Sequence, residues 1–178
     1  QAMDEMVEQE RPFAVVDLSL HEITDHFFDG DYDAGADRGK AALSAGIPTV
    51  LVPGNADFLV TGPLEDAKMR FPGRAYHMHN AAITALSASD EEMAFLGKHL
   101  AQLCNDAKGD YRLLVPMGGF SAFDSEGGPL WNPEGRQVFV DHLTKDISGS
   151  QVKILDYHIN DPEFAQAVLE NIRELTAE

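Results

Sequence analysis

The segment YRLLVPMGGFSAFDSEGGPLWNP, residues 111–133, carries the clearest signal of the fold. It opens with a short apolar run, residues 111–117, that is typical of a buried parallel strand. A loop rich in glycine follows, and a helix is predicted to begin only at Asn132, an N-cap residue followed by Pro133 at the first helical position. A strand, a loop and a helix in this order predict one unit of a parallel α/β sheet.

Four other apolar runs have the same character as residues 111–117. They are FAVVDLS from Phe13, PTVLVPG from Pro48, AYHMH from Ala75 and VKILDYH from Val152. Helices are predicted between these runs over residues 36–46, 89–109, 132–147 and 162–175, and the second of them opens with the capping-box pair Ser89 and Glu92. Strands that alternate with helices predict a Rossmann-like three-layer α/β/α fold, with about five parallel strands and helices on both faces.

The domain organisation follows from length. We expect residues 13–178 to form a single Rossmann-like α/β domain, because 178 residues are an ordinary length for one domain. Residues 1–12 are interpreted as the tail of a preceding helix or a linker. The chain would then be the second half of a larger two-domain protein, with an N-terminal domain as a partner.

Composition excludes two classes of partner. The formal net charge of −17 would repel a phosphate backbone, so nucleic acid is not expected. A membrane is not expected either, since the sequence lacks an apolar run of roughly 18 residues. The single Cys104 and the lack of a hydrophobic leader favour a reducing cytoplasm.

Polar residues gather where each predicted strand ends. The segments are DLSLHE, PGNAD, HMHN, PMGGFSAFDSEGGP and YHIND. In an open parallel sheet these ends share one edge, and ligands bind in the crevice outside it. Local roles compete with this interpretation: Asp161 stands where an N-cap belongs, turn chemistry explains Asn55 and Asp57, and the histidines can serve packing. The His77 and His79 pair has a metal-compatible spacing, but two histidines do not make a site, and no metal ligand is assigned.

The glycine-rich loop predicts an anion site. Gly118, Gly119, Gly127 and Gly128 would let backbone N–H groups approach a phosphate or carboxylate. The loop lacks the Lys and Ser/Thr of a Walker phosphate loop. Ser121, followed by Asp124 or Asp156 and then His158, keeps the chain order of an α/β-hydrolase triad, so a serine-dependent hydrolase is a minor alternative.

Several of these motifs also carry a family resemblance. DAGADR, LVPGNAD, the HN of HMHN, GGFSAFDSEGGPLWNP and HINDPEF resemble the C-terminal half of an uncharacterised bacterial family. That family is related to the N-terminal region of the tomato mosaic virus resistance protein and is labelled a Tm-1-like ATP-binding family. The resemblance implies two Rossmann-like halves in the complete protein and nucleotide binding in the plant relative. It implies ATP or another nucleotide as a ligand, with or without a divalent cation.

The leading hypothesis is a small-molecule binding or enzymatic domain for an anionic ligand, such as a nucleotide or a phosphorylated or carboxylated metabolite. Its catalytic candidates are His158, Asp124 and His79, with His158 and Asp124 as an acid/base pair. Its ligand-binding candidates lie at the strand ends: Asp37, Arg38, Asn55, Asp57, Asn80, Gly118, Gly119, Ser121, Gly127, Gly128, Asn160 and Asp161. The alternatives are a non-catalytic nucleotide-sensing module and a protein-interaction module, and we expect a homo-oligomer.

Overall fold

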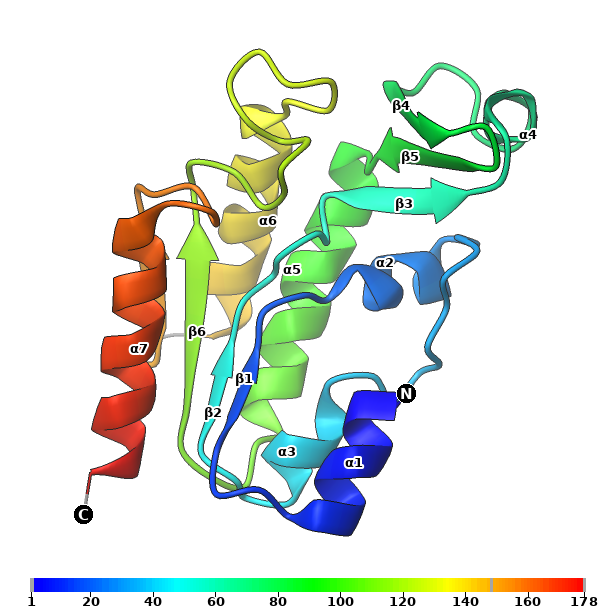
Figure 1. Ribbon diagram of the computed structural model, residues 1–178. Helices are drawn as coiled ribbons and strands as arrows, with labels where there is room; N and C mark the ends of the chain where they lie inside the picture. The colour runs from blue at the N-terminus through cyan, green and yellow to red at the C-terminus, as the bar shows by residue number, and fades with distance from the viewer. Residues whose placement is uncertain (1, 148, 178) are drawn as a thin grey trace.

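A parallel sheet of four strands runs through the centre of the computed structural model, which describes residues 2–147 and 149–177. The strands are β1 (Val15–Asp17), β2 (Thr49–Leu51), β6 (Tyr111–Pro116) and β7 (Val152–Leu155), in the order β1-β2-β6-β7. Their pairing is parallel throughout, and they confirm four of the five predicted strands. The strands point toward the top of Figure 1, where their polar carboxyl ends lie.

The fifth predicted parallel strand is wrong. Residues 76–80 form β4 (Tyr76–Asn80) of a separate antiparallel sheet, with β3 (Phe58–Thr61) and β5 (Ile83–Ser87), in the order β3-β5-β4. Only two residues separate β4 from β5, and such a short connection permits antiparallel pairing alone. The Asn80 side-chain oxygen closes this turn by accepting the Ala82 N–H at 2.9 Å. The small sheet stands beside the carboxyl end of the parallel sheet (Figure 1).

Three long helices pack against the parallel sheet. These are α5 (Asp90–Asn105), α6 (Pro133–Asp146) and α7 (Pro162–Thr176). Leu113 and Val115 share a hydrophobic cluster with residues of α5 and α6, whereas Leu114, whose side chain points the other way, packs with Phe164 of α7. The two faces of β6 therefore meet different helices, and α7 stands alone on its side (Figure 1).

The shorter helices are α1 (Ala2–Glu10), α2 (His21–Phe27), α3 (Lys40–Ser44) and α4 (Leu64–Arg70). Helix α1 packs on α3 through Val7, which is buried with Val15 and Ala42. The helix predicted over residues 36–46 is present only as α3, and α2 was not predicted. The proposed boundary after residue 12 stays a prediction, although helix α1 contacts the rest of the domain closely.

The helix caps follow the sequence signals in part. Ser89 and Glu92 form the predicted capping box, and the Asn132 side chain accepts the Gly135 N–H at 2.9 Å. Asp161 is the N-cap residue of α7, as predicted, but its carboxylate turns back to accept the His158 N–H at 2.7 Å. It therefore fixes the turn before the helix and leaves the helix start uncapped by a side chain.

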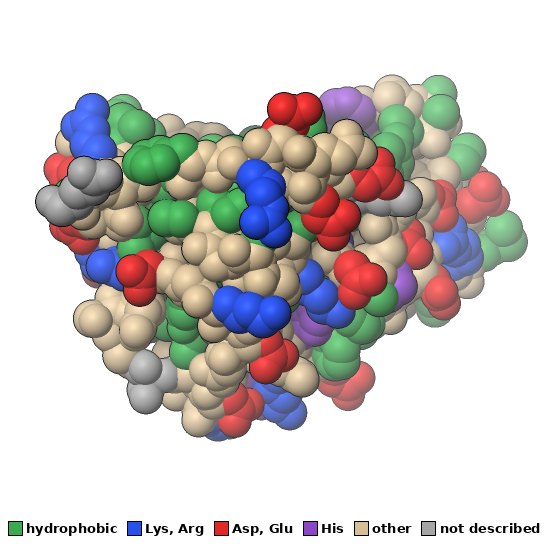
Figure 2. Space-filling view, turned by 90° about the horizontal axis from the view of Figure 1, so that it is seen from below, with side chains coloured by type: hydrophobic (Ala, Val, Ile, Leu, Met, Phe, Trp, Pro, Cys, Tyr) green, Lys and Arg blue, Asp and Glu red, His purple; other side chains and the backbone are tan. Residues whose placement is uncertain are grey.

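The surface carries charges of both signs. Acidic and basic side chains are interspersed, with apolar side chains between them, on the face seen in Figure 2. Among residues 2–147 and 149–177, each helix falls short of the length and apolar character that a membrane-spanning segment requires.

Candidate functional site

A pocket of about 380 Å³ lies between the carboxyl ends of β1 and β2 and the antiparallel sheet. Five segments that are far apart in sequence converge on it. Its lining residues are Ser19, His21, Tyr32, Asn55, Phe58, Val60, His79, Ile83, Ala85 and Phe123. The pocket lies at the sheet edge where a ligand site is predicted from the polar strand ends. Two predicted site residues, Asn55 and His79, line it.

Aromatic rings form the walls of this pocket. Phe123, from the glycine-rich loop, lies 5.4 Å from Phe58 between ring centroids and 4.5 Å from His77. On the other side, His21 lies nearly parallel to Phe58 at 6.3 Å and 6.2 Å from Tyr32. Rings at such separations favour a planar, partly apolar guest that can stack or make edge contacts.

Two polar side chains form the floor nearest the parallel sheet. The Asn55 amide donates to the Ser19 hydroxyl oxygen at 3.1 Å, and the Asn55 backbone N–H donates to the Phe120 carbonyl at 2.9 Å. Asn55 has a positive φ of 59°, a conformation that asparagine tolerates better than most residues. The turn conformation therefore accounts for an asparagine at position 55, and the side-chain amide of Asn55 also borders the pocket.

The charge inside the pocket is small. Burial lowers the pKa of His21 from its ordinary value, the nearby Glu22 opposes this, and the Arg38 charge adds to it. A histidine with a lowered pKa is neutral at pH 7. The described lining residues include neither lysine nor arginine. The pocket thus offers ring faces, imidazole nitrogens and an amide rather than a fixed positive charge.

Arg38 is predicted as a ligand contact, but its guanidinium makes its hydrogen bonds to other residues of the protein. Its guanidinium donates to both carboxylate oxygens of Asp17, at 2.6 and 2.9 Å, and to the Ser19 carbonyl at 2.7 Å. It also lies 3.5 Å from Glu22. Burial pulls the pKa of Arg38 down, but the Asp17 hydrogen bond and negative charges raise it overall. Arg38 therefore compensates Asp17 and positions Ser19 at the end of β1.

The glycine-rich loop uses its amide groups internally. Gly118 donates to the Tyr157 carbonyl at 2.8 Å, Gly119 to the Pro116 carbonyl at 3.1 Å and Gly128 to the Ser125 carbonyl at 2.6 Å. A Cβ on Gly118 would lie 2.5 Å from the His158 nitrogen. These three glycines allow close backbone approach and hydrogen bonding within the loop. Because their N–H groups already donate to carbonyl oxygens, they are not available to the predicted anion nest. Gly127, with a φ of 76° and open space around it, serves the turn.

A buried polar network holds the base of this loop. The Ser121 hydroxyl donates to Asp57 Oδ2 at 2.7 Å, and Asp124 forms an ion pair with Arg136. Asp124 also accepts the N–H groups of Phe120 and Asn132 at 3.1 and 3.0 Å. Asp124 is fully buried, and its two oxygens are occupied, so its geometry is that of an anchor and not of an exposed acid or base.

The His158 ring is also engaged at both nitrogens. Nε2 lies 2.9 Å from the Ser121 carbonyl, and Nδ1 accepts the Asn160 N–H at 3.1 Å. Because a carbonyl can only accept, Nε2 carries the proton in this arrangement. His158 thus faces the carbonyl of Ser121 and not its hydroxyl, which points at Asp57. The Ser-Asp-His order of the hydrolase alternative does not produce a catalytic triad here.

The other predicted residues lie away from the pocket. Asp37 is exposed and pairs with Lys40 at 2.9 Å, and Asn80 closes the β4–β5 turn. Asn160 and Asp161 belong to the turn after β7. Within the described part of the chain, no three His, Cys, Asp or Glu side chains gather as a metal site requires.

Sequence reasoning missed several residues that matter. His21, Tyr32, Phe58 and Phe123 line the pocket, and Arg136 neutralises Asp124. The aromatic residues occur in the segments that were singled out or next to them, but a single aromatic residue in a loop does not reveal which surface it faces. Arg136 stands in the first turn of a helix, where an exposed side chain is the ordinary expectation.

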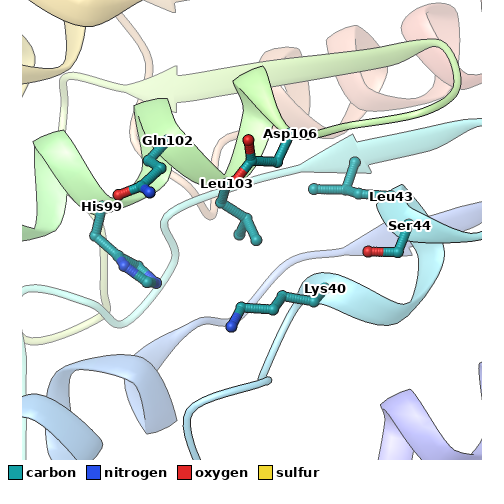
Figure 3. A pocket seen from close by; sticks show the side chains of 7 residues that line it. All are labelled: Lys40, Leu43, Ser44, His99, Gln102, Leu103 and Asp106. Atoms are coloured by element: carbon teal, nitrogen blue, oxygen red, sulfur yellow. The ribbon is translucent and has the colours of Figure 1, made fainter.

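A second cavity, about 390 Å³, lies between α3 and α5. Figure 3 shows Lys40 and His99 reaching toward the same space from the two helices, with Leu43 and Leu103 behind them. Burial and the Lys40 charge lower the pKa of His99. This cavity is away from the strand ends, and Lys40 is paired with Asp37 beside it, so we do not take it as the functional site.

The uncharacterised protein family UPF0261, C-terminal domain, matches residues 1–176. The chain belongs to this family. A UPF0261 protein of Clostridium tetani is 32% identical over 173 residues, which cover 96% of this chain and 43% of the relative. A UPF0261 protein of Brucella melitensis is 31% identical over 157 residues, 88% of this chain and 38% of the relative.

A plant protein shares the same domain. The ToMV resistance protein Tm-1 of Solanum lycopersicum is 29% identical over 178 residues, which cover 98% of this chain and 24% of that protein. The predicted resemblance is thus confirmed. The UPF0261 chain spans less than half the length of the bacterial relatives that it matches.

Proposed function

We propose that this UPF0261 domain binds a small molecule with a planar ring, of the nucleoside type, in the pocket between Ser19, His79 and Phe123. The observation that carries the proposal is the convergence of aromatic and imidazole rings with an amide at the carboxyl edge of the parallel sheet. Stacking on such rings accepts any base, and the Asn55 amide and His79 imidazole offer polar contacts to its edge.

The proposal treats the parallel sheet and its helices as a Rossmann-like three-layer arrangement. Four parallel strands with α5 and α6 on one side and α7 on the other support this. In sheets of this kind, ligands bind outside the carboxyl ends of the strands, which is where the pocket lies. A pocket of about 380 Å³ is large enough for a nucleoside-sized group.

The anionic part of a nucleotide receives weaker support from this half. Arg38 is neutralised by Asp17, and the amides of Gly118 and Gly119 are used inside the loop. We therefore propose that the ring, and not a phosphate tail, supplies most of the affinity to this domain. Adenosine and ATP should then bind this chain with similar strength.

The contacts of the predicted catalytic residues favour ligand binding without turnover. Asp124 is buried in an ion pair and both nitrogens of His158 are occupied, which leaves His79 as the predicted catalytic residue that lines the pocket. In this proposal the imidazoles of His21 and His79, which both line the pocket, serve recognition by hydrogen bonding and ring contact. Turnover of the bound nucleotide is the alternative to this binding role.

Calorimetric titration with adenosine and with ATP tests the proposal. Phe123→Ala and His79→Ala should weaken adenosine binding by about tenfold or more, because base–aromatic stacking contributes roughly 1–3 kcal/mol. Phe13→Ala is the matched control, since Phe13 is 75% exposed at the opposite end of β1. Lack of saturable binding by either compound, or equal affinity in all variants, contradicts the proposal. Chromatography of the recovered ATP detects turnover, which would favour the enzymatic alternative.

A further inference from the structure

An apolar groove of about 540 Å³ runs between β1 and α7. Side chains of the β1 end form one wall and side chains of α7 form the other. The lining includes Val16, Leu18, Ile159, Phe164, Val168 and Leu169. Most of these are aliphatic, and the larger ones at the groove mouth are open to solvent: Val16 is 39% exposed, Leu18 48% and Leu169 47%.

The groove exists because α7 covers only part of its face of the sheet. Helix α7 contacts β2 and β6, and the side chains that it buries are Val50, Val52 and Leu114. Val16 pairs in register with Val50 and points to the same side, but its side chain stays partly open to solvent. Parallel sheets are normally covered on both faces, so the β1 end of this face lacks the layer that would bury it.

The two flanks of α7 differ in chemistry. Toward β7, the helix presents Glu170 and Gln166, which hydrogen-bond each other, and Glu174 pairs with Lys153 at 3.7 Å. Toward β1, it presents Ala165, Leu169 and Ile172. A helix in contact with water on both flanks would have polar residues on both, so the apolar flank indicates a surface that a protein partner covers.

The groove is continuous with the candidate ligand pocket. Ser19 and Asn55 line both cavities, and the Asn55 amide donates to the Ser19 hydroxyl at the boundary between them. A protein segment bound in the groove would therefore place its own side chains at the rim of the pocket. That position suits a partner that supplies what the pocket lacks, a fixed positive charge beside the rings.

The family relationship indicates which protein segment occupies the groove. The match is to the C-terminal domain of UPF0261, and the matched region is 43% of the Clostridium tetani protein. Family members thus carry more chain than this domain, joined to it covalently and at high effective concentration. A second copy of this chain would have to bring charge of the same sign, −17, against this one.

From these observations we propose that the groove between β1 and α7 is the docking surface for the N-terminal half of the UPF0261 protein. Leu18 and Leu169 are its central contacts. The seated N-terminal half completes the rim of the pocket at Ser19 and Asn55. The docking surface does not depend on the proposed ligand, since it is carried by the groove and by the length of the relatives.

The test uses the full-length Clostridium tetani protein, with glutamate at the positions aligned with Leu18 and Leu169. We expect the unmodified protein to unfold in one transition and the double variant in two. Proteolysis between its halves should be faster in the variant by about tenfold or more, because cleavage follows the population of the open form. Glutamate at the position aligned with Gln166, on the polar flank of α7, is the matched control and should change neither measurement. An unaltered transition and cleavage rate in the double variant would overturn the proposal.

A second measurement uses the 178-residue chain itself. In place of the homo-oligomer expected from the sequence, the docking proposal predicts that this chain sediments as a monomer at all concentrations. Leu18→Glu and Leu169→Glu should leave its thermal transition and its adenosine titration in place, because both side chains are about half exposed. If the chain instead forms a dimer that Leu169→Glu dissociates, the occupant is a second copy and the proposal fails. Since adenosine binding is measured on the same variants, failure of the docking surface and failure of the ligand pocket are distinguishable.

Discussion

The Ser121 hydroxyl donates a 2.7 Å hydrogen bond to the Asp57 carboxylate across 64 positions of sequence, and both side chains are buried. The contact joins the loop after β2 to the glycine-rich loop after β6. Asp57 Oδ1 has no hydrogen-bond partner among the described residues. Burial raises the pKa of Asp57 to about 7, the Ser121 hydrogen bond opposes this, and the Asp124 charge adds to it.

The first prediction concerns the pH dependence of stability. Since the pKa of Asp57 is higher in the folded state than in the unfolded chain, its contribution is full below about pH 4 and is lost as the pH rises through 7. Asp57→Asn keeps an acceptor for Ser121 and cannot ionise. The variant should therefore gain stability relative to the wild type between pH 5 and pH 8, on the order of 3 kcal/mol.

Urea denaturation at pH 5 and pH 8 measures this difference. Asp66→Asn, at an exposed carboxylate on helix α4, is a suitable control. A constant difference between Asp57→Asn and the wild type at both pH values would show that Asp57 is ionised in the same way in the folded and unfolded states.

The second prediction concerns Ser121. Its hydroxyl is buried and points at Asp57, while His158 faces its carbonyl, so a fluorophosphonate probe should not label the protein. Ser121→Ala should lower the free energy of unfolding by about 1–3 kcal/mol, because the buried carboxylate loses a donor. Mass spectrometry and urea denaturation measure the two effects. Stoichiometric labelling of Ser121 would restore the hydrolase alternative.

The third prediction concerns the buried ion pair. Arg136→Met should lower the free energy of unfolding by about 3–5 kcal/mol, because Asp124 is then a buried anion without a cation. Arg136 also donates to the Met117 carbonyl at 2.9 Å and lies 4.4 Å from the centroid of the Trp131 ring. Arg173→Met, at an exposed arginine of α7, is the control and should change little. Equal effects of the two substitutions would refute the anchoring role of Arg136.

The fourth prediction concerns the wall of the pocket that carries Tyr32. Asp25 is buried and accepts the N–H groups of Tyr32 and Val60 at 2.9 and 3.0 Å. Burial raises the pKa of Asp25 to about 6, so it is ionised at pH 8. Asp25→Asn replaces one acceptor oxygen by an NH₂ group, and the lost bond should cost about 1–3 kcal/mol.

Hydrogen exchange at pH 8 locates that effect. The Tyr32 and Val60 amides should exchange about tenfold faster or more in Asp25→Asn, since 1.4 kcal/mol corresponds to a factor of ten. Asp29→Asn changes an exposed carboxylate in the loop that follows helix α2 and should leave both rates unaltered. If the two substitutions change the exchange rates of these amides equally, Asp25 does not stabilise the pocket wall that carries Tyr32.

The fifth prediction separates packing from anion binding in the glycine-rich loop. A Cβ on Gly118 would lie 2.5 Å from the His158 backbone nitrogen, so Gly118→Ala should lower the melting temperature, at a cost of about 1–3 kcal/mol. Gly62→Ala meets its nearest atom, Asp66 Oδ2, at 3.5 Å and should be tolerated. Thermal melts with and without phosphate complete the test, and a phosphate-dependent rise in the wild type alone would argue for the nest.

The parts of the fold that local patterns encode were predictable. Apolar runs at residues 111–116 and 152–155 became parallel strands, and Ser89 with Glu92 formed its capping box, because these signals act within a few residues. The strand at residues 76–80 was misassigned because β5, its hairpin partner, was overlooked. Once β5 is known, a two-residue connection leaves antiparallel pairing as the only choice.

Sequence patterns alone predict the α/β class, the starts of α5, α6 and α7, and the edge at which polar residues gather. Contacts between distant segments of the chain determine which of those residues are free to contact a ligand. Arg38 and Asp17 are 21 positions apart and Arg136 and Asp124 are 12 apart, yet each pair is buried in contact and neutralised. His79 and Asn55, by contrast, meet Tyr32 and Phe123 around open space. A buried charge requires a partner wherever in the chain that partner lies, and this requirement acts through space, so local sequence does not reveal it.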